Sequence, residues 1–176
     1  MIVLALDVSS ISTGWANLAI LKAKKAKAPL AKVKGFGCIM PKSSLSTERL
    51  IMFESQLKSL IYEVKPDICV IEDLNHLRNM DVVKVLASFL GTAKKVCYEY
   101  HKQEPILIRR SHVLKQTVGN GDASKEEVVK YIEKLFNLTL PEIGKEDIAD
   151  AIVTGYCYVI EAGKIPTTEG DGNGKN

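Results

Sequence analysis

The 176-residue sequence has no apolar run long enough to cross a bilayer, and no basic segment precedes the apolar residues at its start. A transmembrane protein and a secretory leader are therefore not expected, and the sequence predicts a cytoplasmic protein. Cysteine is scarce, and no two of the four are spaced like zinc ligands. Each lies among apolar residues, so we expect buried, reduced thiols at Cys38, Cys69, Cys97 and Cys157.

Acidic residues are absent between positions 8 and 47, where seven lysines occur, although the net charge of the whole chain is only +3. Lysine-rich loops contact phosphates without reading base sequence. We therefore expect the basic connection in this stretch to contact DNA through Lys22, Lys24, Lys25 and Lys27. A solvated hairpin tip is the alternative interpretation of the same lysines.

Hydrophobic periodicity predicts one α/β domain over residues 1–165, without internal repeats or linkers. Apolar, β-branched runs predict strands at 1–7, 15–21, 33–40, 67–72 and 105–108. Spacings of three and four predict helices at about 46–64, 79–100, 124–136 and 145–161. The order βββαβαβαα predicts a central mixed five-stranded sheet flanked by helices. The tail, 166–176, is rich in Thr, Gly, Asp and Asn and is expected to be disordered.

Two local signals mark ends of these elements. Gly14 closes the turn SSISTG, where we expect it to take a positive φ. Ser124 and Glu127 have the spacing of a capping box at the start of the third predicted helix.

Four acidic residues interrupt apolar runs: Asp7, Glu72, Asp147 and Asp150. A buried carboxylate is costly without a partner, and the predicted strands offer no Lys or Arg beside them. If the first and fourth strands are neighbours, their acids meet at the carboxyl edge of the sheet, and the two on the last helix share one face. Four such carboxylates can hold two Mg²⁺ ions and support phosphodiester hydrolysis. Helix-dipole stabilisation and turn capping remain simpler roles for individual acids.

The segments LALDVSSISTG, VIEDL, DIADAI and RRSHVLKQTVGNGDASKEEV resemble RuvC-type Holliday-junction resolvases of the RNase H-like nuclease superfamily. The resemblance covers nearly the whole chain and implies an RNase H-like fold and a homodimer that cuts four-way DNA junctions. It implies Mg²⁺ or Mn²⁺, two per active site, and a dimer contact through the helix that begins near residue 79. The matching positions imply catalytic roles for the four acids, which bind the metal, and for two lysines near the scissile phosphate: Asp7, Glu72, Asp147, Asp150, Lys115 and Lys125.

The basic residues also have an interpretation of their own. A lysine near a metal–carboxylate site can neutralise charge in the transition state, and Lys125 lies in a first helical turn against the helix dipole. Arg109 and Arg110 are candidates for phosphate contacts, with structural salt bridges as the alternative. Resolvases of this type carry an aromatic residue shortly after the middle acid, but residues 73–76 read DLNH. His76 is the side chain left to stack on a base.

The missing aromatic residue after Glu72 and the lysine-rich segment suggest looser selectivity for branched DNA, as in a phage-encoded member working in its host's cytoplasm. Three other functions fit parts of the pattern. A related RNase H-fold nuclease would cut RNA precursors, RNA–DNA hybrids or flaps with the same acids. The start DxSxxxTG also resembles sugar kinases and actin-like ATPases, which need a second lobe. A module that binds junctions without cutting them would not need all four acids.

Overall fold

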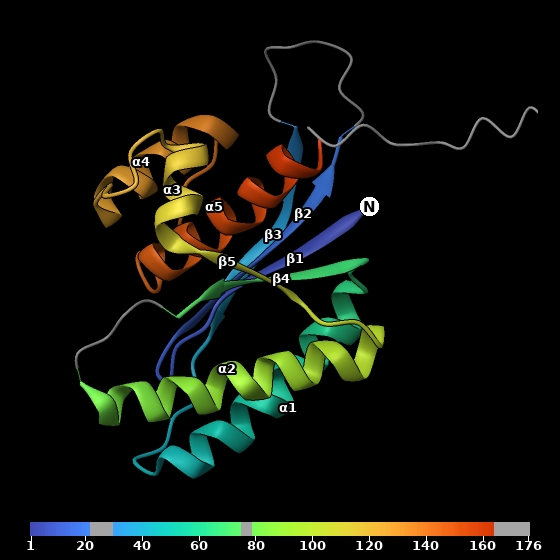
Figure 1. The fold of residues 1–176 in the computed structure, drawn as a ribbon, viewed down its shortest axis with the longest axis vertical. Coiled ribbons are helices and arrows are strands. Elements are labelled where there is room, and N and C mark those ends of the chain that lie inside the picture. The colour runs from blue at the N-terminus through green and yellow to red at the C-terminus, as the bar shows by residue number, and fades with distance from the viewer. Residues whose placement is uncertain (22–29, 75–78, 164–176) are drawn as a thin grey trace, which may run out of the picture.

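The computed structural model describes residues 1–21, 30–74 and 79–163, which form a five-stranded sheet with helices on both faces (Figure 1). The strands are β1 (Ile2–Asp7), β2 (Thr13–Ile20), β3 (Ala31–Ile39), β4 (Ile68–Asp73) and β5 (Ile106–Arg109). The helices are α1 (Ser46–Val64), α2 (Met80–His101), α3 (Arg110–Thr117), α4 (Lys125–Phe136) and α5 (Lys145–Ala162). In these described ranges no helix has the length and apolar character needed to cross a membrane. The predicted tail at 166–176 lies outside the described residues.

The five predicted strands and four predicted helices are confirmed, but the sequence pattern missed α3. Only Val113 and Leu114 are buried in this eight-residue helix. Because these two are adjacent, they give no three- or four-residue apolar spacing, so the segment reads as a loop. The element order is therefore βββαβαβααα, with α3 inserted directly behind β5.

The sheet order is β3-β2-β1-β4-β5. β2 runs antiparallel to both β1 and β3, whereas β1, β4 and β5 are parallel, so the predicted mixed sheet is confirmed. β1 is central and buried on both faces, which explains its continuous apolar run. Its side chains alternate between two cores: Val3 and Ala5 face one, and Leu4 and Leu6 face the other.

The two cores hold the two helical layers against the sheet. α1 and α2 cover the face of Leu4 and Leu6, whereas α3, α4 and α5 cover the other face (Figure 1). α5 lies across the middle of the sheet and is the most deeply buried helix, with Ile148, Ile152 and Val153 almost fully excluded from solvent. It is therefore the element that brings the C-terminal part of the chain to the centre of the sheet.

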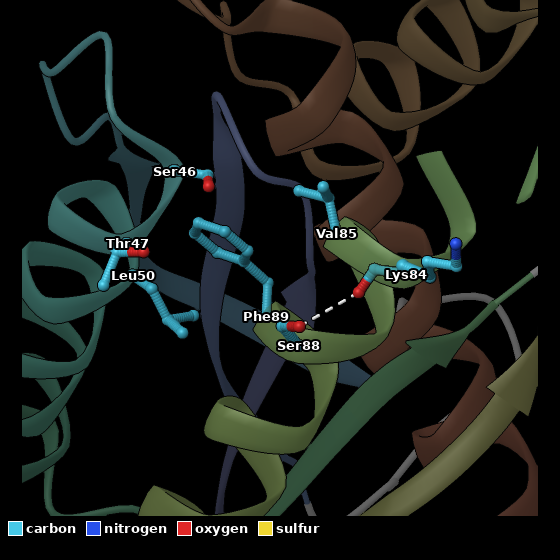
Figure 2. A pocket seen from close by; sticks show the side chains of 7 residues that line it. All are labelled: Ser46, Thr47, Leu50, Lys84, Val85, Ser88 and Phe89. Atoms are coloured by element: carbon cyan, nitrogen blue, oxygen red, sulfur yellow. Dashed lines mark hydrogen bonds between the residues drawn. The ribbon is translucent and has the colours of Figure 1, made fainter. Parts of the chain in front are cut away.

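α1 and α2 lie side by side and leave a hollow of about 190 Å³ near their N-terminal ends. Leu50 from α1 and Val85 and Phe89 from α2 form its apolar wall (Figure 2). The ring of Phe89 also packs against the ring of Phe53, with the centroids 5.3 Å apart. The hollow thus opens at the same end of the sheet as the carboxyl ends of the parallel strands.

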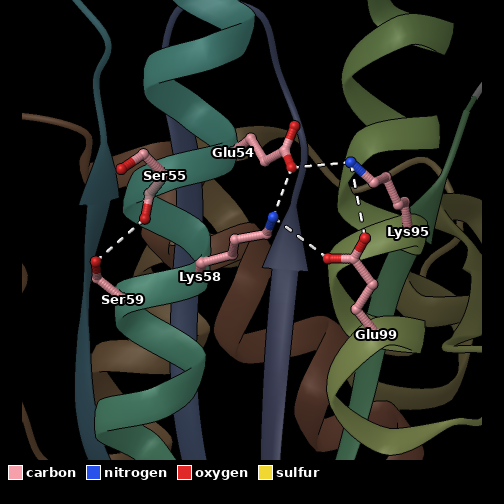
Figure 3. A network of polar contacts seen from close by, with 6 residues as sticks. All are labelled: Glu54, Ser55, Lys58, Ser59, Lys95 and Glu99. Atoms are coloured by element: carbon pink, nitrogen blue, oxygen red, sulfur yellow. Dashed lines mark hydrogen bonds and ion pairs between the residues drawn. The ribbon is translucent and has the colours of Figure 1, made fainter.

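A ring of four charges ties the outer surfaces of α1 and α2 together (Figure 3). Lys58 Nζ lies 2.7 Å from Glu54 and 3.3 Å from Glu99, and Lys95 Nζ lies 2.9 Å from Glu54 and 3.7 Å from Glu99. All four side chains are partly exposed, so each pair contributes little stability alone. Two of these pairs, Lys58–Glu99 and Lys95–Glu54, join α1 to α2.

Candidate active site

Asp7 and Glu72 meet at the carboxyl edge of the sheet. Leu6 of β1 pairs in parallel register with Ile71 of β4, and the two acids are the next residues along each strand. Because side chains alternate along a strand, both acids point to the face that α5 covers. The first and fourth strands are therefore neighbours, and they place two carboxylates side by side.

α5 adds Asp147 and Asp150 to this edge. Asp150 is only 2% exposed, and the other buried side chains of its helix are mostly apolar. The Oγ of Ser12, in the β1–β2 turn, donates a hydrogen bond of 2.5 Å to Asp147 Oδ2. This contact ties the first turn of α5 to the loop that follows Asp7.

Gly14 is the reason why α5 can come so close. A Cβ atom at this position would lie 2.0 Å from the Asp147 carbonyl oxygen, so only glycine fits. The positive φ expected for Gly14 is wrong: the residue lies within β2 in ordinary strand conformation. Its missing side chain, and not its backbone freedom, is what the site requires. Gly155 has a similar role further along, where a Cβ would lie 2.8 Å from Ala5 Cβ.

Electrostatics show that the acids share one site. Burial raises the pKa of Asp7 to about 7, and the charges of Asp150 and Asp147 add to the rise. Burial and the charges of Asp7 and Asp150 raise the pKa of Glu72 to about 8. The pKa of Asp150 is also raised, first by burial, although Arg110 acts against it. Carboxyl groups in this state bind protons or other cations strongly.

Arg110 lies inside the acid cluster, which corrects the expectation that no basic residue accompanies the acids. Its Nη1 lies 2.7 Å from Asp150 Oδ1 and 3.5 Å from Glu72 Oε2. β5 pairs with β4 at this edge, and α3 begins directly after it, so the first residue of α3 faces Glu72. Of the two interpretations of Arg110, the structure shows the salt bridge. One guanidinium cannot balance the charge of four ionised carboxylates.

The contacts of Arg110 leave two acceptors unsatisfied. Among the described residues, no hydrogen bond of normal geometry reaches Glu72 Oε2 or Asp150 Oδ1, and both atoms are buried. Arg110 reaches both of these oxygens as an ion pair. Two buried carboxylate oxygens that converge from β4 and α5, with one guanidinium between them, fit a hard divalent cation such as Mg²⁺.

Lys125 stands beside the acids at the start of α4. Its Nζ lies 3.1 Å from Glu146 Oε2. Burial alone would lower the pKa of Lys125, but the hydrogen bond to Glu146 and the charge of Asp150 raise it above its ordinary value, so the side chain stays charged. The expected capping box of Ser124 and Glu127 is confirmed and fixes the start of this helix.

Lys115 and Arg109 are not in the acid cluster. Both are exposed and line a separate hollow of about 690 Å³ between β5, α3 and the end of α5. The remaining predicted DNA contacts fall outside the described residues: Lys22, Lys24, Lys25, Lys27 and His76. The structure therefore brings together the four acids with Lys125 and Arg110, and places Lys115 and Arg109 on a neighbouring surface.

Sequence reasoning missed two residues that build the site. Ser12 gave no signal of its own, because serine in a turn usually bonds to nearby backbone, as Ser9 does here. For Gly14, the sequence predicted a role for its backbone freedom, whereas the site requires its missing side chain. The contact between Gly14 and Asp147 joins segments that are far apart in the sequence, so it is recognised only in the three-dimensional structure.

The sequence model of the family described as crossover junction endodeoxyribonuclease RuvC matches residues 3–158, which include all four acids. Curated proteins of that name from Tolumonas auensis and Geobacter sp. strain M21 are each 27% identical to the chain. The first alignment covers 89% of the chain and 86% of the relative, and the second covers 97% and 99%.

Solved structures share the fold. Thermus thermophilus RuvC in complex with Holliday junction substrate has a TM-score of 0.75 at 19% identity, covering 92% of this chain and 94% of that one. The Fowlpox virus Holliday junction resolvase has a TM-score of 0.56 at 14% identity, covering 92% and 99%. These likenesses confirm the RNase H-like fold. The chain belongs to the crossover junction endodeoxyribonuclease RuvC family, a family of metal-dependent resolvases.

Proposed function

We propose that residues 1–165 form a metal-dependent endodeoxyribonuclease that resolves four-way DNA junctions by paired nicks during recombination and replication. The observation that carries this proposal is the convergence of four carboxylates on one sheet edge, in a chain of the RuvC family. Branched DNA is a substrate of the cell interior, so the proposed place of action is the cytoplasm, or the host's cytoplasm for a phage-encoded member.

The proposed metal ligands are Asp7, Glu72, Asp147 and Asp150. They suit two Mg²⁺ or Mn²⁺ ions, because both ions prefer carboxylate oxygen and four carboxylates supply enough negative charge for two. When bound, such ions activate a water molecule and stabilise the leaving oxygen of a phosphodiester. The unsatisfied oxygens of Glu72 and Asp150 support this assignment.

The protein's own cations have separate proposed roles. Lys125 lies at the edge of the site, where its ammonium group can neutralise charge on the phosphate as the bond breaks. Arg110 pairs with Asp150 and Glu72 and reduces the repulsion between acids. Because these carboxylates are already held in place before the substrate binds, less reorganisation of the site is needed for the reaction.

DNA binding is proposed to extend from the site along the neighbouring surface. Lys115 and Arg109 line the hollow beside α3, where they can bind phosphates of an arm that leaves the active site. The basic residues at 22–27 and His76 are proposed to contact DNA as well. Phosphate contacts of this kind weaken as salt increases.

A homodimer through α2 is proposed because two opposed strands must be cut. Met80 and Val82 at the start of α2 are 63% and 45% exposed. Val85 and Phe89 of the same helix line the hollow shown in Figure 2. Apolar side chains exposed next to an apolar hollow favour burial by a second copy. Two copies related by a twofold axis would present two acid clusters to one junction.

Cleavage mapping on a mobile four-way junction tests the proposal. With Mg²⁺, the chain should cut opposed strands at symmetry-related positions, and faster than an RNA–DNA hybrid or a flap of the same sequence. The Val82→Glu variant should keep the chemistry but make single, unpaired nicks. Faster cutting of the hybrid would favour an RNA-directed nuclease, and binding without any cutting would favour a junction-binding module.

A further inference from the structure

A second group of metal-binding side chains lies on the α3–α5 side of the molecule. His112, Cys157 and Glu161 each offer one ligand atom, and all three atoms lie within 4.8 Å of one another. Cys157 is seven residues beyond Asp150 on α5, which corresponds to about 10 Å along the helix axis. The group is therefore separate from the carboxylate site.

Two helices contribute to this group. Cys157 and Glu161 are one turn apart and lie on the same face of α5, and His112 comes from the first turns of α3. His112 Nε2 and Glu161 Oε1 are already in contact at 2.5 Å. Both side chains line the hollow beside α3, whereas Cys157 is fully buried beneath them. A cation can therefore reach the group from solvent.

The three ligand types decide which cation fits. Nitrogen, sulfur and oxygen together suit zinc and similar borderline-soft ions, whereas Mg²⁺ takes oxygen ligands. Three protein ligands leave one tetrahedral position for water, and that position would face the hollow. The carboxylate site has the opposite preference, because it offers oxygen alone.

Binding a metal requires an adjustment of the three ligand atoms, which lie within 4.8 Å of one another. Ligand atoms around a tetrahedral zinc ion lie roughly 3.3–3.8 Å apart, given metal–ligand bonds of about 2.0–2.3 Å. His112 and Glu161 must separate slightly from their direct contact. Their side chains are 46% and 37% exposed, so they can rotate without disturbing the core.

We infer that His112, Cys157 and Glu161 form a binding site for a zinc-class divalent cation that fastens α3 to α5. Arg110 lies two residues before His112 and is the first residue of α3. A cation that fixes α3 therefore also fixes the guanidinium that binds Asp150 and Glu72. This site lies outside the proposed reaction, and its role is to position α3.

Cobalt titration of the full chain tests the site. The protein is freed of metal with a chelator and kept in excess Mg²⁺, which occupies the carboxylate site. Co²⁺ should then bind in one equivalent and produce a thiolate-to-cobalt absorption band, and Zn²⁺ should displace it. Cys157→Ser should abolish the band, whereas Cys97→Ser, a buried thiol on the other side of the sheet, should retain it.

The exposed ligands provide a check that does not depend on a core substitution. His112→Ala and Glu161→Gln should each weaken cobalt binding by at least about tenfold while leaving the circular dichroism spectrum unchanged. Zinc should slow amide hydrogen exchange in α3 of the wild type and not of His112→Ala. Absence of the thiolate band in the wild type, or unchanged cobalt affinity in His112→Ala, would show an ordinary His–Glu ion pair and overturn the inference.

Discussion

Gly14 of β2 lies against Asp147 of α5 so closely that no side chain fits between them. The nearest backbone atom would stand 2.0 Å from an added Cβ, and the next 2.3 Å away, both within Asp147. A small change at this contact must move the helix that carries two of the four acids. The glycine therefore controls the geometry of the site without touching substrate.

Gly14→Ala should reduce Mg²⁺-dependent cleavage by about 100-fold or more, because catalysis is sensitive to displacements of about 1 Å. Overpacking at the contact should lower the free energy of unfolding by about 1–3 kcal/mol. Single-turnover cleavage rates and chemical denaturation measure the two effects. Gly35→Ala is the matched control, since its Cβ would meet the Trp15 ring at an ordinary 3.7 Å. Equal loss of cleavage in both variants would contradict this role for Gly14.

The raised pKa values of Asp7, about 7, and Glu72, about 8, predict how stability depends on pH. Both groups bind a proton more tightly in the folded chain than in the unfolded chain, where their pKa values are about 4. The metal-free protein should therefore gain stability as pH falls through 8 and 7, and should be least stable above that range.

Denaturation in a chelator at pH values from about 9 to about 6 measures this effect, with an expected gain of about 2 kcal/mol or more. Excess Mg²⁺ should raise stability most at the alkaline end, where the carboxylates are ionised. A double variant, Asp7→Asn with Glu72→Gln, should show a much flatter profile. A wild-type profile that declines as pH falls over this range would be inconsistent with the burial of these acids.

Arg110→Gln should destabilise the metal-free protein by about 3–5 kcal/mol, because it leaves buried carboxylates without their cation. Mg²⁺ should restore much of the loss, since metal ions and Arg110 neutralise the same group. Unfolding curves with and without Mg²⁺ measure the difference between the two conditions. Arg109→Gln, an exposed neighbour, should change stability little in either condition. A loss in Arg110→Gln that Mg²⁺ leaves untouched would argue against a shared carboxylate site.

The sequence was most informative where local pattern and topology agree. Asp7 and Glu72 each lie at the carboxyl end of a continuous apolar strand. When such strands pair in parallel, their carboxyl ends lie at the same edge of the sheet. Asp147 and Asp150 share a helix face by spacing alone. These features predicted a carboxylate edge of the sheet, whereas the family was indicated by the resemblance of whole segments such as LALDVSSISTG and DIADAI.

Features that depend on contacts between segments distant in the sequence could not be predicted from local sequence patterns. Arg110 enters the acid cluster because a short helix, α3, starts directly behind β5, and α3 has no apolar period to reveal it. Gly14 and Ser12 act on Asp147 across the fold. Lys115 and Lys125 matched one motif, yet only Lys125 lies beside the acids, because the loop between α3 and α4 separates them.

Lys125→Met should lower the rate of the cleavage step by about 100- to 1000-fold and leave junction affinity nearly unchanged. The side chain stays charged beside the acids, so its loss removes charge neutralisation in the transition state. Lys130→Met on the same helix is the matched control, because Lys130 is exposed and pairs with Glu126. Single-turnover rates at saturating enzyme separate binding from chemistry. Equal rates for the two variants would assign Lys125 to binding alone.

The most direct test of the shared metal site compares two conservative variants at opposite ends of β1 and β4. Asp7→Asn removes one proposed ligand, whereas Asp67→Asn makes the same chemical change at the exposed amino end of β4. With Mg²⁺ and a four-way junction, Asp7→Asn should cut at least about 100-fold more slowly while still binding the junction, and Asp67→Asn should cut like the wild type. Cleavage by Asp7→Asn at the wild-type rate would contradict the account.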